Sequence, residues 1–439
     1  MDLRALLVSY SFPPVGGAGV QRVVKLAKYL PCHGVRPAVL TARNPSVPVR
    51  DESLMRDVPS RTEVARVPTL EPGYGAKRAA WRAEAGCASP AARALRAAAG
   101  VVRHVLFPDA QVLWQPAAHG ALAARIAARR DDVVLVSGPP FSQFLLAPLA
   151  RAGGLGVVLD YRDEWSTLRT SYEMTRSRVA AALGDPLEAA LLRRAHAVVT
   201  ATDEFRENLL ARFPFVDPAR VVAIPNGYDP DDFPADLPGP PRDRFVLTYA
   251  GTVFALTSAR GLLGAVRRLH ERRPDLAGSL RLRFVGRVVD TELGAFEGAD
   301  ALGVERLDYV PHSEVLRRLA ASHMTACILD DVPGAERIYP AKIFELMHLG
   351  RPVLTMAPPG SALARLVERH ALGPLLPPRD EAAIASTLEA HLEAFRRGDN
   401  PADTWRNASR TDRYDRRALA GEFAGILRAA AARAGRRGS

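Results

Sequence analysis

The chain alternates apolar runs with amphipathic segments, and this alternation occurs twice along its 439 residues. Residues 3–8 form an apolar run interrupted only by Arg4, a glycine-rich turn follows, and apolar residues then recur at helical spacing from Val20 to Leu30. Residues 36–41 supply a second apolar run, so the opening predicts a strand, a helix and a second strand. Repeated units of this kind predict a parallel α/β sheet that is covered on both faces.

A proline-rich segment separates the two alternating regions. Residues 229–244 contain five prolines, which disfavour both a helix and a central strand. We therefore expect an N-terminal Rossmann-like domain over residues 1–228, a linker over 229–244 and a C-terminal Rossmann-like domain over 245–410. The final residues, 411–439, are expected to form a helix that packs back on the N-terminal domain. Two such domains facing each other would leave a ligand cleft at the carboxyl ends of their strands.

Charge and cysteine content limit the setting in which the protein works. A net charge of +11 attracts anionic partners such as nucleic acid, phospholipid headgroups or phosphorylated substrates. The cysteines at 32, 87 and 327 are far apart and fit neither a disulfide framework nor a metal clamp, which favours a reducing cytosol. The first apolar run is typical of a strand rather than a signal peptide, and no uninterrupted apolar stretch is long enough to span lipid. We expect a cytoplasmic protein.

Residues 76–107 form the segment that most suggests a membrane surface. They mix arginines with Trp81, Leu95, Leu106 and Phe107, as an interfacial amphipathic helix does. The alternative is a solvated helical face in an arginine-rich and alanine-rich protein. The hypothesis is contact with an anionic membrane, peripheral at the inner face of the plasma membrane, and no nucleic-acid partner is expected.

A glycine-rich turn after the first strand is a candidate anion site. Gly16 and Gly17 precede a helix, where backbone N–H groups can face a phosphate. Gly17, Gly19 and Arg22 give GxGxxR rather than the dinucleotide fingerprint, and no GxxxxGK occurs. A nicotinamide or flavin dehydrogenase and a Walker-type NTPase are therefore disfavoured. A tight turn without any ligand remains the alternative.

The segment ERIYPAKIFELMHLGRPVLTM, from Glu336 to Met356, predicts a short helix that leads into a strand. Lys342 and Glu345 lie three residues apart and so share one face of that helix. A cation and a carboxylate near a helix N-terminus can hold a phosphate and a sugar hydroxyl together. An ordinary surface ion pair is the alternative.

Ten segments, in order, resemble the family 4 glycosyltransferases of the GT-B fold, in which two Rossmann-like α/β domains face each other across a cleft. They include FPPVGGAGVQR near the start, LDYRDEW from Leu159, IPNGYDPDDF from Ile224 and YPAKIFELMHLGRPVLT from Tyr339. The resemblance implies a UDP- or GDP-sugar donor held mainly by the C-terminal domain and an acceptor held mainly by the N-terminal domain. It also implies transfer with retention at the anomeric carbon.

The resemblance assigns donor-binding residues. Arg260 matches the basic residue of the family's lysine–glycine pair, and Arg260 and Lys342 are the expected catalytic cations beside the leaving diphosphate. Gly16 and Gly17 would add backbone amides. Glu345 matches the second glutamate of the paired-glutamate motif, which grips the ribose. Arg337 stands where the first glutamate is expected, so Glu336 is one residue out of register, and Tyr339 completes the candidate donor set.

Acceptor-binding candidates come from the N-terminal half. Arg162, Asp163 and Trp165 resemble a family segment at a strand end, where an aromatic ring beside a carboxylate suits a sugar. A buried Arg–Asp pair beneath Trp165 is the alternative. Arg22 and Ser137 complete the set, and Ser137 lies where relatives often place a histidine. Without an obvious protein base, the family's front-face transfer is expected, in which the donor phosphate takes the acceptor proton.

The predicted function is a retaining glycosyltransferase that acts on a glycan, lipid-linked or small-molecule acceptor in cell-surface polysaccharide or glycoconjugate biosynthesis. No cofactor and no metal are expected, since no Asp-x-Asp motif stands at a strand end. The alternatives are a nucleotide-sugar 2-epimerase on the same fold and a non-catalytic protein that binds nucleotide sugars.

Overall fold

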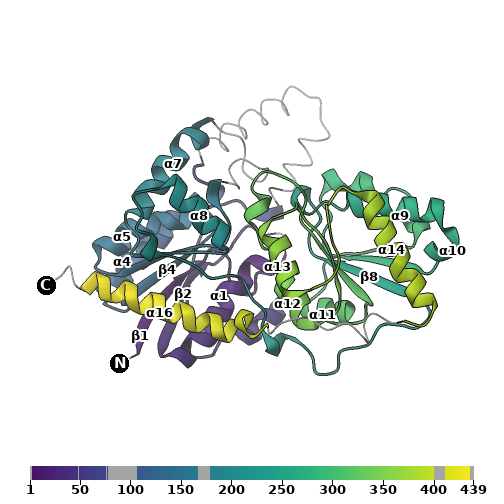
Figure 1. The fold of residues 1–439 in the computed structure, drawn as a ribbon. Helices are drawn as coiled ribbons and strands as arrows, with labels where there is room; N and C mark the ends of the chain where they lie inside the picture. The colour runs from purple at the N-terminus through teal and green to yellow at the C-terminus, as the bar shows by residue number, and fades with distance from the viewer. Residues whose placement is uncertain are drawn as a thin grey trace. The chain divides into compact units, whose positions relative to one another are not determined.

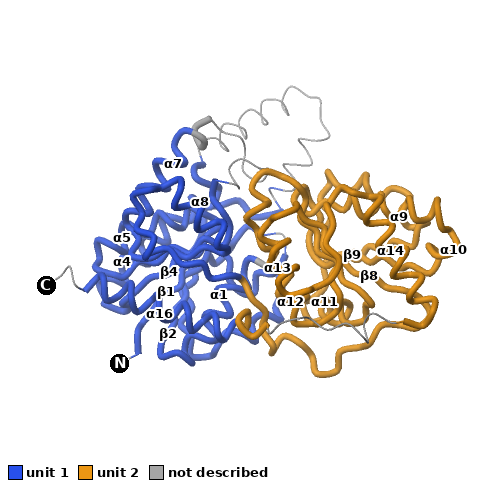
Figure 2. Tube along the Cα trace, viewed as in Figure 1, with its two compact units in different colours: residues 1–225, 416–439 blue, residues 226–415 orange. Residues whose placement is uncertain are grey.

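The computed structural model describes residues 2–47, 49–75, 77, 106–166, 178–399 and 411–435. The chain forms two compact units, shown in Figure 2. Unit 1 comprises residues 1–225 and 416–439, and unit 2 comprises residues 226–415. The candidate membrane segment 76–107 lies outside the described residues except at positions 77, 106 and 107.

Unit 1 is built on a parallel sheet of seven strands in the order β3-β2-β1-β4-β5-β6-β7. The strands are β1 (Leu3–Val8), β2 (Val35–Ala42), β3 (Glu63–Val67), β4 (Val133–Gly138), β5 (Gly156–Tyr161), β6 (Ala197–Thr200) and β7 (Val221–Ala223). The chain moves outward in one direction from β1 and in the other from β4. Their carboxyl ends therefore form a topological switch point, the place where open α/β sheets bind ligands.

Helices cover both faces of this sheet (Figure 1). Successive residues of a strand point to opposite faces, so Leu7 packs with Val23 and Phe423 on one face, and Leu6 packs with Trp114 and Phe144 on the other. The first face carries α1 (Ala18–Tyr29) and α16 (Arg416–Gly435), and the second carries α4 (Gln115–Ala127), α5 (Ala147–Ala152), α7 (Arg178–Leu192) and α8 (Asp203–Arg212). Short 3₁₀ segments are η1 (Leu30–His33), η2 (Glu52–Asp57), η3 (Ala110–Trp114), η4 (Phe141–Leu146) and η5 (Pro218–Arg220).

Unit 2 repeats this architecture with six parallel strands in the order β10-β9-β8-β11-β12-β13. The strands are β8 (Phe245–Ala250), β9 (Leu280–Val285), β10 (Val304–Leu307), β11 (Met324–Ile328), β12 (Val353–Met356) and β13 (Leu375–Leu376). One face packs on α9 (Arg260–Arg272), α10 (Pro274–Ala277) and α14 (Glu381–Arg396), and the other on α11 (His312–Ala320), α12 (Lys342–Leu349) and α13 (Ala362–His370). Short 3₁₀ segments are η6 (Pro230–Asp232), η7 (Ala255–Thr257), η8 (Asp290–Phe296), η9 (Asp300–Leu302), η10 (Ala335–Arg337) and η11 (Asp412–Tyr414). The prediction of two Rossmann-like α/β units is confirmed, and the switch point of unit 2 lies between β8 and β11.

The expected linker, residues 229–244, is assigned to unit 2 rather than to a separate connection. Asp229 and Asp232 are buried, and the Arg317 guanidinium on α11 pairs with the Asp236 carboxylate at 2.8 Å. Residues 411–415 also belong to unit 2, so residues 416–439 alone carry the chain back to unit 1. The two segments that enter and leave unit 2 pair with each other.

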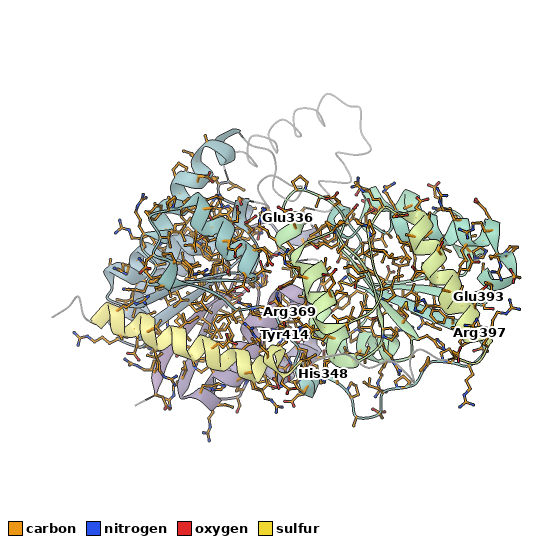
Figure 3. The ribbon with its side chains drawn as sticks, in the orientation of Figure 1. Glu336, His348, Arg369, Glu393, Arg397 and Tyr414 are labelled. Carbon is orange, nitrogen blue, oxygen red and sulfur yellow. The ribbon has the colours of Figure 1, made fainter. Side chains whose placement is uncertain are left out.

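Backbone and ring contacts fix that pairing. The Tyr228 amide donates to the Tyr414 carbonyl at 3.0 Å, and the Tyr228 ring stacks on His348 with ring centroids 4.0 Å apart. Figure 3 labels His348 and Tyr414. On the unit 1 side, α16 approaches β5 so closely that a Cβ at Gly156 would lie 2.7 Å from the Ala431 nitrogen.

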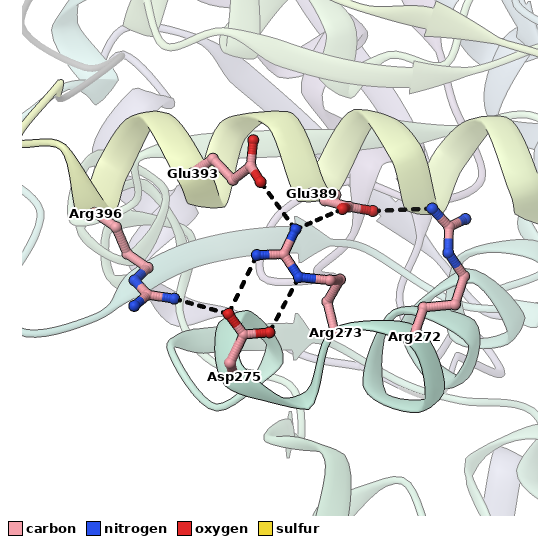
Figure 4. A network of polar contacts seen from close by, with 6 residues as sticks. All are labelled: Arg272, Arg273, Asp275, Glu389, Glu393 and Arg396. Carbon is pink, nitrogen blue, oxygen red and sulfur yellow. Dashed lines mark hydrogen bonds and ion pairs between the residues drawn. The ribbon is translucent and has the colours of Figure 1, made fainter.

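Charged side chains join α9, α10 and α14 at one corner of unit 2, as Figure 4 shows. Arg273 donates to Asp275, Glu389 and Glu393, and these three carboxylates raise the pKa of its guanidinium above its ordinary value. Arg272 and Arg396 extend the network to Glu389 and Asp275. The network is exposed to solvent, so it serves to orient the three helices more than to stabilise them.

Among the described residues, none of the helices combines the length and the apolar composition that crossing a membrane requires.

Candidate functional site

Two glycines shape the carboxyl edge of the unit 2 sheet. Gly251 follows β8 and Gly286 follows β9, with φ of +134° and +129°. A Cβ at Gly286 would lie 2.6 Å from the Gly251 carbonyl oxygen, so the two strand ends can approach this closely only because Gly286 lacks a side chain. The ends of β8 and β9 therefore lie close together beside the switch point.

Lys342, the first residue of α12, lies over this glycine turn. Its Nζ donates to the Tyr249 hydroxyl at 2.7 Å and lies 3.9 Å from the centroid of that ring. The Tyr249 hydroxyl in turn donates to the Thr252 carbonyl at 3.0 Å. A Cβ at Gly251 would come within 2.5 Å of Nζ. The ammonium group is thus positioned by a ring, a hydroxyl and a missing side chain, at the edge where open α/β sheets generally bind ligands.

Glu345 lies one turn further along α12 and contacts a different helix. Its Oε1 is 3.0 Å from Nε2 of His312, the first residue of α11, and both side chains are mostly buried. Nδ1 of His312 lies 4.0 Å from the Asp232 carboxylate. The arrangement fixes the carboxylate of Glu345 near the first turn of α12.

The other predicted donor residues of unit 2 are more exposed. Arg260 begins α9, and its guanidinium donates to the Thr291 carbonyl at 2.9 Å and lies 3.4 Å from the Glu292 carboxylate. Its side chain is 59% exposed, so the charge remains accessible to a ligand. Glu336, labelled in Figure 3, is half exposed and pairs with the neighbouring Arg337. Tyr339 packs edge-on against Phe344, with ring centroids 5.9 Å apart.

In unit 1 the glycine turn after β1 differs from the expectation. The Gly16 amide donates to the Val49 carbonyl at 3.1 Å, so this amide is already engaged inside the unit. The anion-binding role expected for it is therefore corrected. Gly17 caps α1 with φ +99°, and no atom lies within 4 Å of the place where its Cβ would be.

Arg22 and Ser137 meet around a carboxylate that the sequence analysis did not single out. The Arg22 guanidinium lies 2.9 Å from Asp160 and also donates to the Ile224 and Pro225 carbonyls, while the Ser137 hydroxyl donates to Asp160 at 2.7 Å. The Arg22 and Asp160 side chains are 4% and 0% exposed. The predicted acceptor role of Arg22 and Ser137 does not fit this burial, because their polar groups are used to join α1, β4 and β5.

The DYRDEW segment separates into buried and exposed parts. Arg162 donates to the Gly138 carbonyl at 3.3 Å and also contacts the carbonyls of Pro139 and Gly19. Trp165 is 0% exposed, and its ring stacks on Phe141 with centroids 5.0 Å apart. Its ring faces belong to the core, so the expected stacking on a sugar is corrected. Asp163 is exposed and remains a candidate acceptor residue.

The N-terminal half of the chain matches a known family. Residues 15–232 match the family described as Glycosyltransferase Family 4. The N-terminal half of the chain therefore belongs to glycosyltransferase family 4. A curated relative, the D-inositol 3-phosphate glycosyltransferase of Stackebrandtia nassauensis, is 29% identical over 213 residues. The match covers 46% of this chain and 47% of that protein, so it spans about half the length of the relative.

Solved structures align with nearly the whole chain and support its two-unit α/β fold. Sucrose-phosphate synthase from Thermosynechococcus elongatus aligns with a TM-score of 0.64 and 15% identity, over 97% of this chain and 98% of that one. Anabaena HepE, solved in complex with UDP and glucose, aligns with a TM-score of 0.63 and 15% identity, over 97% and 100%. At 15% sequence identity the structural similarity is evidence for the fold alone, and it confirms the predicted GT-B class.

Three residues hold the candidate side chains in place, and the sequence analysis did not predict this role for any of them. They are Tyr249 beneath Lys342, His312 beside Glu345 and Asp160 beside Arg22. One signal was available for Asp160, because a carboxylate inside an apolar strand needs a buried partner. Tyr249 and His312 lie 93 and 33 residues from their partners, and no local pattern relates them.

Proposed function

We propose that the protein is a retaining glycosyltransferase that moves a sugar from a UDP- or GDP-sugar to a glycan, lipid-linked or small-molecule acceptor. The observation that carries the proposal is the position of Lys342 over Tyr249 and Gly251, at the switch point of unit 2, with Glu345 one turn away. The complex of HepE with UDP and glucose supports a nucleotide-sugar donor for a protein of this fold.

The chemistry requires fixed positive charge beside the leaving group. When the bond between the anomeric carbon and the phosphate oxygen breaks, negative charge grows on the nucleoside diphosphate. The Lys342 ammonium, at the N-terminus of α12, and the Arg260 guanidinium, at the N-terminus of α9, would stabilise that charge. Both groups are held before the donor arrives, so little reorganisation is needed during the reaction.

Glu345 is suited to the donor's ribose. A carboxylate accepts hydrogen bonds from two neighbouring hydroxyls, and His312 fixes its orientation through one oxygen. Tyr339 lies three residues before the first residue of α12 and would contact the same part of the donor. We propose that Glu336 lies near the sugar of the donor.

Retention follows if the acceptor attacks on the face from which the diphosphate leaves. A bond forms between the acceptor oxygen and the anomeric carbon, the bond to the phosphate oxygen breaks, and the acceptor proton passes to that phosphate oxygen. The reaction then needs neither a protein base nor a metal. Retention of activity in EDTA, and product of the same anomeric configuration as the donor, would support this scheme.

The acceptor is proposed to bind unit 1, where Asp163 is exposed at the end of β5. The same proposal places the enzyme in the cytoplasm, in the synthesis of a cell-surface polysaccharide or glycoconjugate. Attachment to an anionic membrane through residues 76–107 is a separate hypothesis, which vesicle flotation at low and high salt would test.

The decisive experiment measures release of UDP or GDP from a panel of nucleotide sugars, with and without acceptors. Lys342→Ala, Glu345→Ala and Arg260→Ala should each lower transfer, by about 10²–10³-fold for a lost transition-state contact. Arg268→Ala is the matched control, since Arg268 also lies on α9 and is 54% exposed, against 59% for Arg260. Unchanged transfer in the Lys342 variant would refute the site. Conversion of the donor to an epimer without acceptor would indicate an epimerase instead.

A further inference from the structure

Unit 1 contains a cavity of about 180 Å³ whose charged lining the proposed function does not explain. It lies where β1, β2 and β3 end, because Phe12 follows β1, Arg43 follows β2, and Arg66 is in the last part of β3. Arg50 and Tyr74 complete the side chains that matter here. The carboxyl edge of a parallel sheet is the edge that binds ligands.

Backbone contacts hold the three arginines in place. The Asp51 amide donates to the Pro14 carbonyl at 2.8 Å, and Val15 forms an antiparallel bridge with Arg50. The Arg43 guanidinium donates to the Arg66 carbonyl at 3.2 Å. The Arg66 guanidinium donates to the Pro13 carbonyl, which places it against the glycine turn. These contacts gather cations from three segments around one space.

The charges of this cavity are poorly balanced. Burial and the nearby Arg50 lower the pKa of Arg66, whereas the Glu52 carboxylate acts in the opposite direction. Arg50 and Arg66 both line the cavity, so two like charges share it. The Glu52 carboxylate is 3.7 Å from Arg50, but both side chains are largely exposed, so their attraction is weak. An anion with several oxygens would relieve the repulsion. Guanidinium groups match a phosphate geometrically, since each can donate two parallel hydrogen bonds.

The cavity offers apolar surface as well as charge. Phe12 and Tyr74 line it together with Pro14, Val15, Pro45 and Val47. A volume of about 180 Å³ has room for several water molecules, more than a bare phosphate needs. A ring or chain attached to the phosphate would fill the remainder against these side chains.

We propose that this cavity binds a phosphate group of the acceptor, so that the acceptor is a phosphorylated molecule and Arg43, Arg50 and Arg66 select it. The identification of the ligand as the acceptor rests on the proposed function, whereas phosphate binding itself depends only on unit 1. The shared chemistry is a phosphate ester, which can belong to a soluble sugar phosphate or to a lipid headgroup.

Calorimetry with the full chain tests the binding. Glucose 6-phosphate should bind and glucose should not, or a vesicle of phosphatidylcholine with phosphatidic acid should bind and one of phosphatidylcholine alone should not. The first result indicates a soluble source and the second a lipid source. Failure of both phosphorylated probes to bind, or equal binding of the neutral and phosphorylated probes, would overturn the proposal.

Variants assign the binding to the cavity. Arg43→Gln with Arg50→Gln should weaken the bound probe by at least tenfold, because each lost charge-assisted hydrogen bond is worth about a factor of ten or more. Both side chains are exposed, so folding should be preserved, and Arg66→Gln is a further test. Arg61→Gln, an exposed arginine just before β3, is the control of equal charge change. Equal weakening by the control would refute the assignment.

The two proposals fail in different ways. Binding of UDP or GDP and slow donor hydrolysis depend on unit 2 and should be unchanged in the Arg43/Arg50 variant. If the protein binds glucose 6-phosphate through these arginines but binds no nucleotide sugar, the proposed phosphate site stands and the proposed transferase activity is refuted. If the protein transfers sugar to neutral acceptors and the Arg43/Arg50 variant is as active as the parent, only the proposed role of the cavity is refuted.

Discussion

Replacing Arg22 by Met should unfold unit 1 at a distinctly lower temperature. The guanidinium is 4% exposed, and its loss leaves the Asp160 carboxylate, which is 0% exposed, without its charged partner. The Ile224 and Pro225 carbonyls lose their donor as well. Removing one member of a buried ion pair costs about 3–5 kcal/mol. For a unit of this size each kcal/mol lowers the midpoint by about 2–4 °C, so the shift is roughly 6–20 °C.

Scanning calorimetry and tryptophan fluorescence would measure the shift, since Trp114 and Trp165 are buried in unit 1. The double variant Arg22→Met with Asp160→Leu tests the cause. It removes the stranded charge, so it should recover much of the loss, and the non-additivity of the two changes gives the coupling energy. If Arg22→Met melted like the parent yet weakened acceptor binding, the structural role argued for this arginine would be wrong.

Further predictions concern unit 2. Burial raises the pKa of the Cys327 thiol to about 11, so at pH 8 a thiol reagent should modify the exposed Cys32 and leave Cys327 unlabelled until denaturant is added, as peptide mass mapping would show. Burial lowers the pKa of His348 below its ordinary 6.5, so the unfolded chain binds the proton more readily and unit 2 should lose stability as the pH falls below about 6.5. Melting curves of His348→Gln should depend less on pH, and an unchanged dependence would count against this cause. Gly251→Ala should cost about 1–3 kcal/mol, because φ is +134°, and should also reduce transfer by displacing Lys342. Wild-type stability together with wild-type transfer would contradict it.

The sequence predicted most regular elements because buried parallel strands appear as continuous apolar runs. The run from Gly156 to Tyr161 matches β5, and the predicted helix at 340–349 contains α12. The same reasoning misjudged residues 229–244. Prolines exclude a helix or a central strand, but they do not say whether a segment packs, and this one is held by Arg317 on a distant helix.

Residue type and local spacing by themselves determined the α/β class, the glycine turn after the first strand and the shared helix face of Lys342 and Glu345, since these depend on neighbours within a few positions. Only the tertiary structure decided which polar groups a ligand can reach. Arg22, Ser137 and Trp165 have the chemistry of a sugar site, yet the fold buries each of them. Burial is a property of partners far along the chain, such as Asp160 and Phe423, and a local pattern does not contain it.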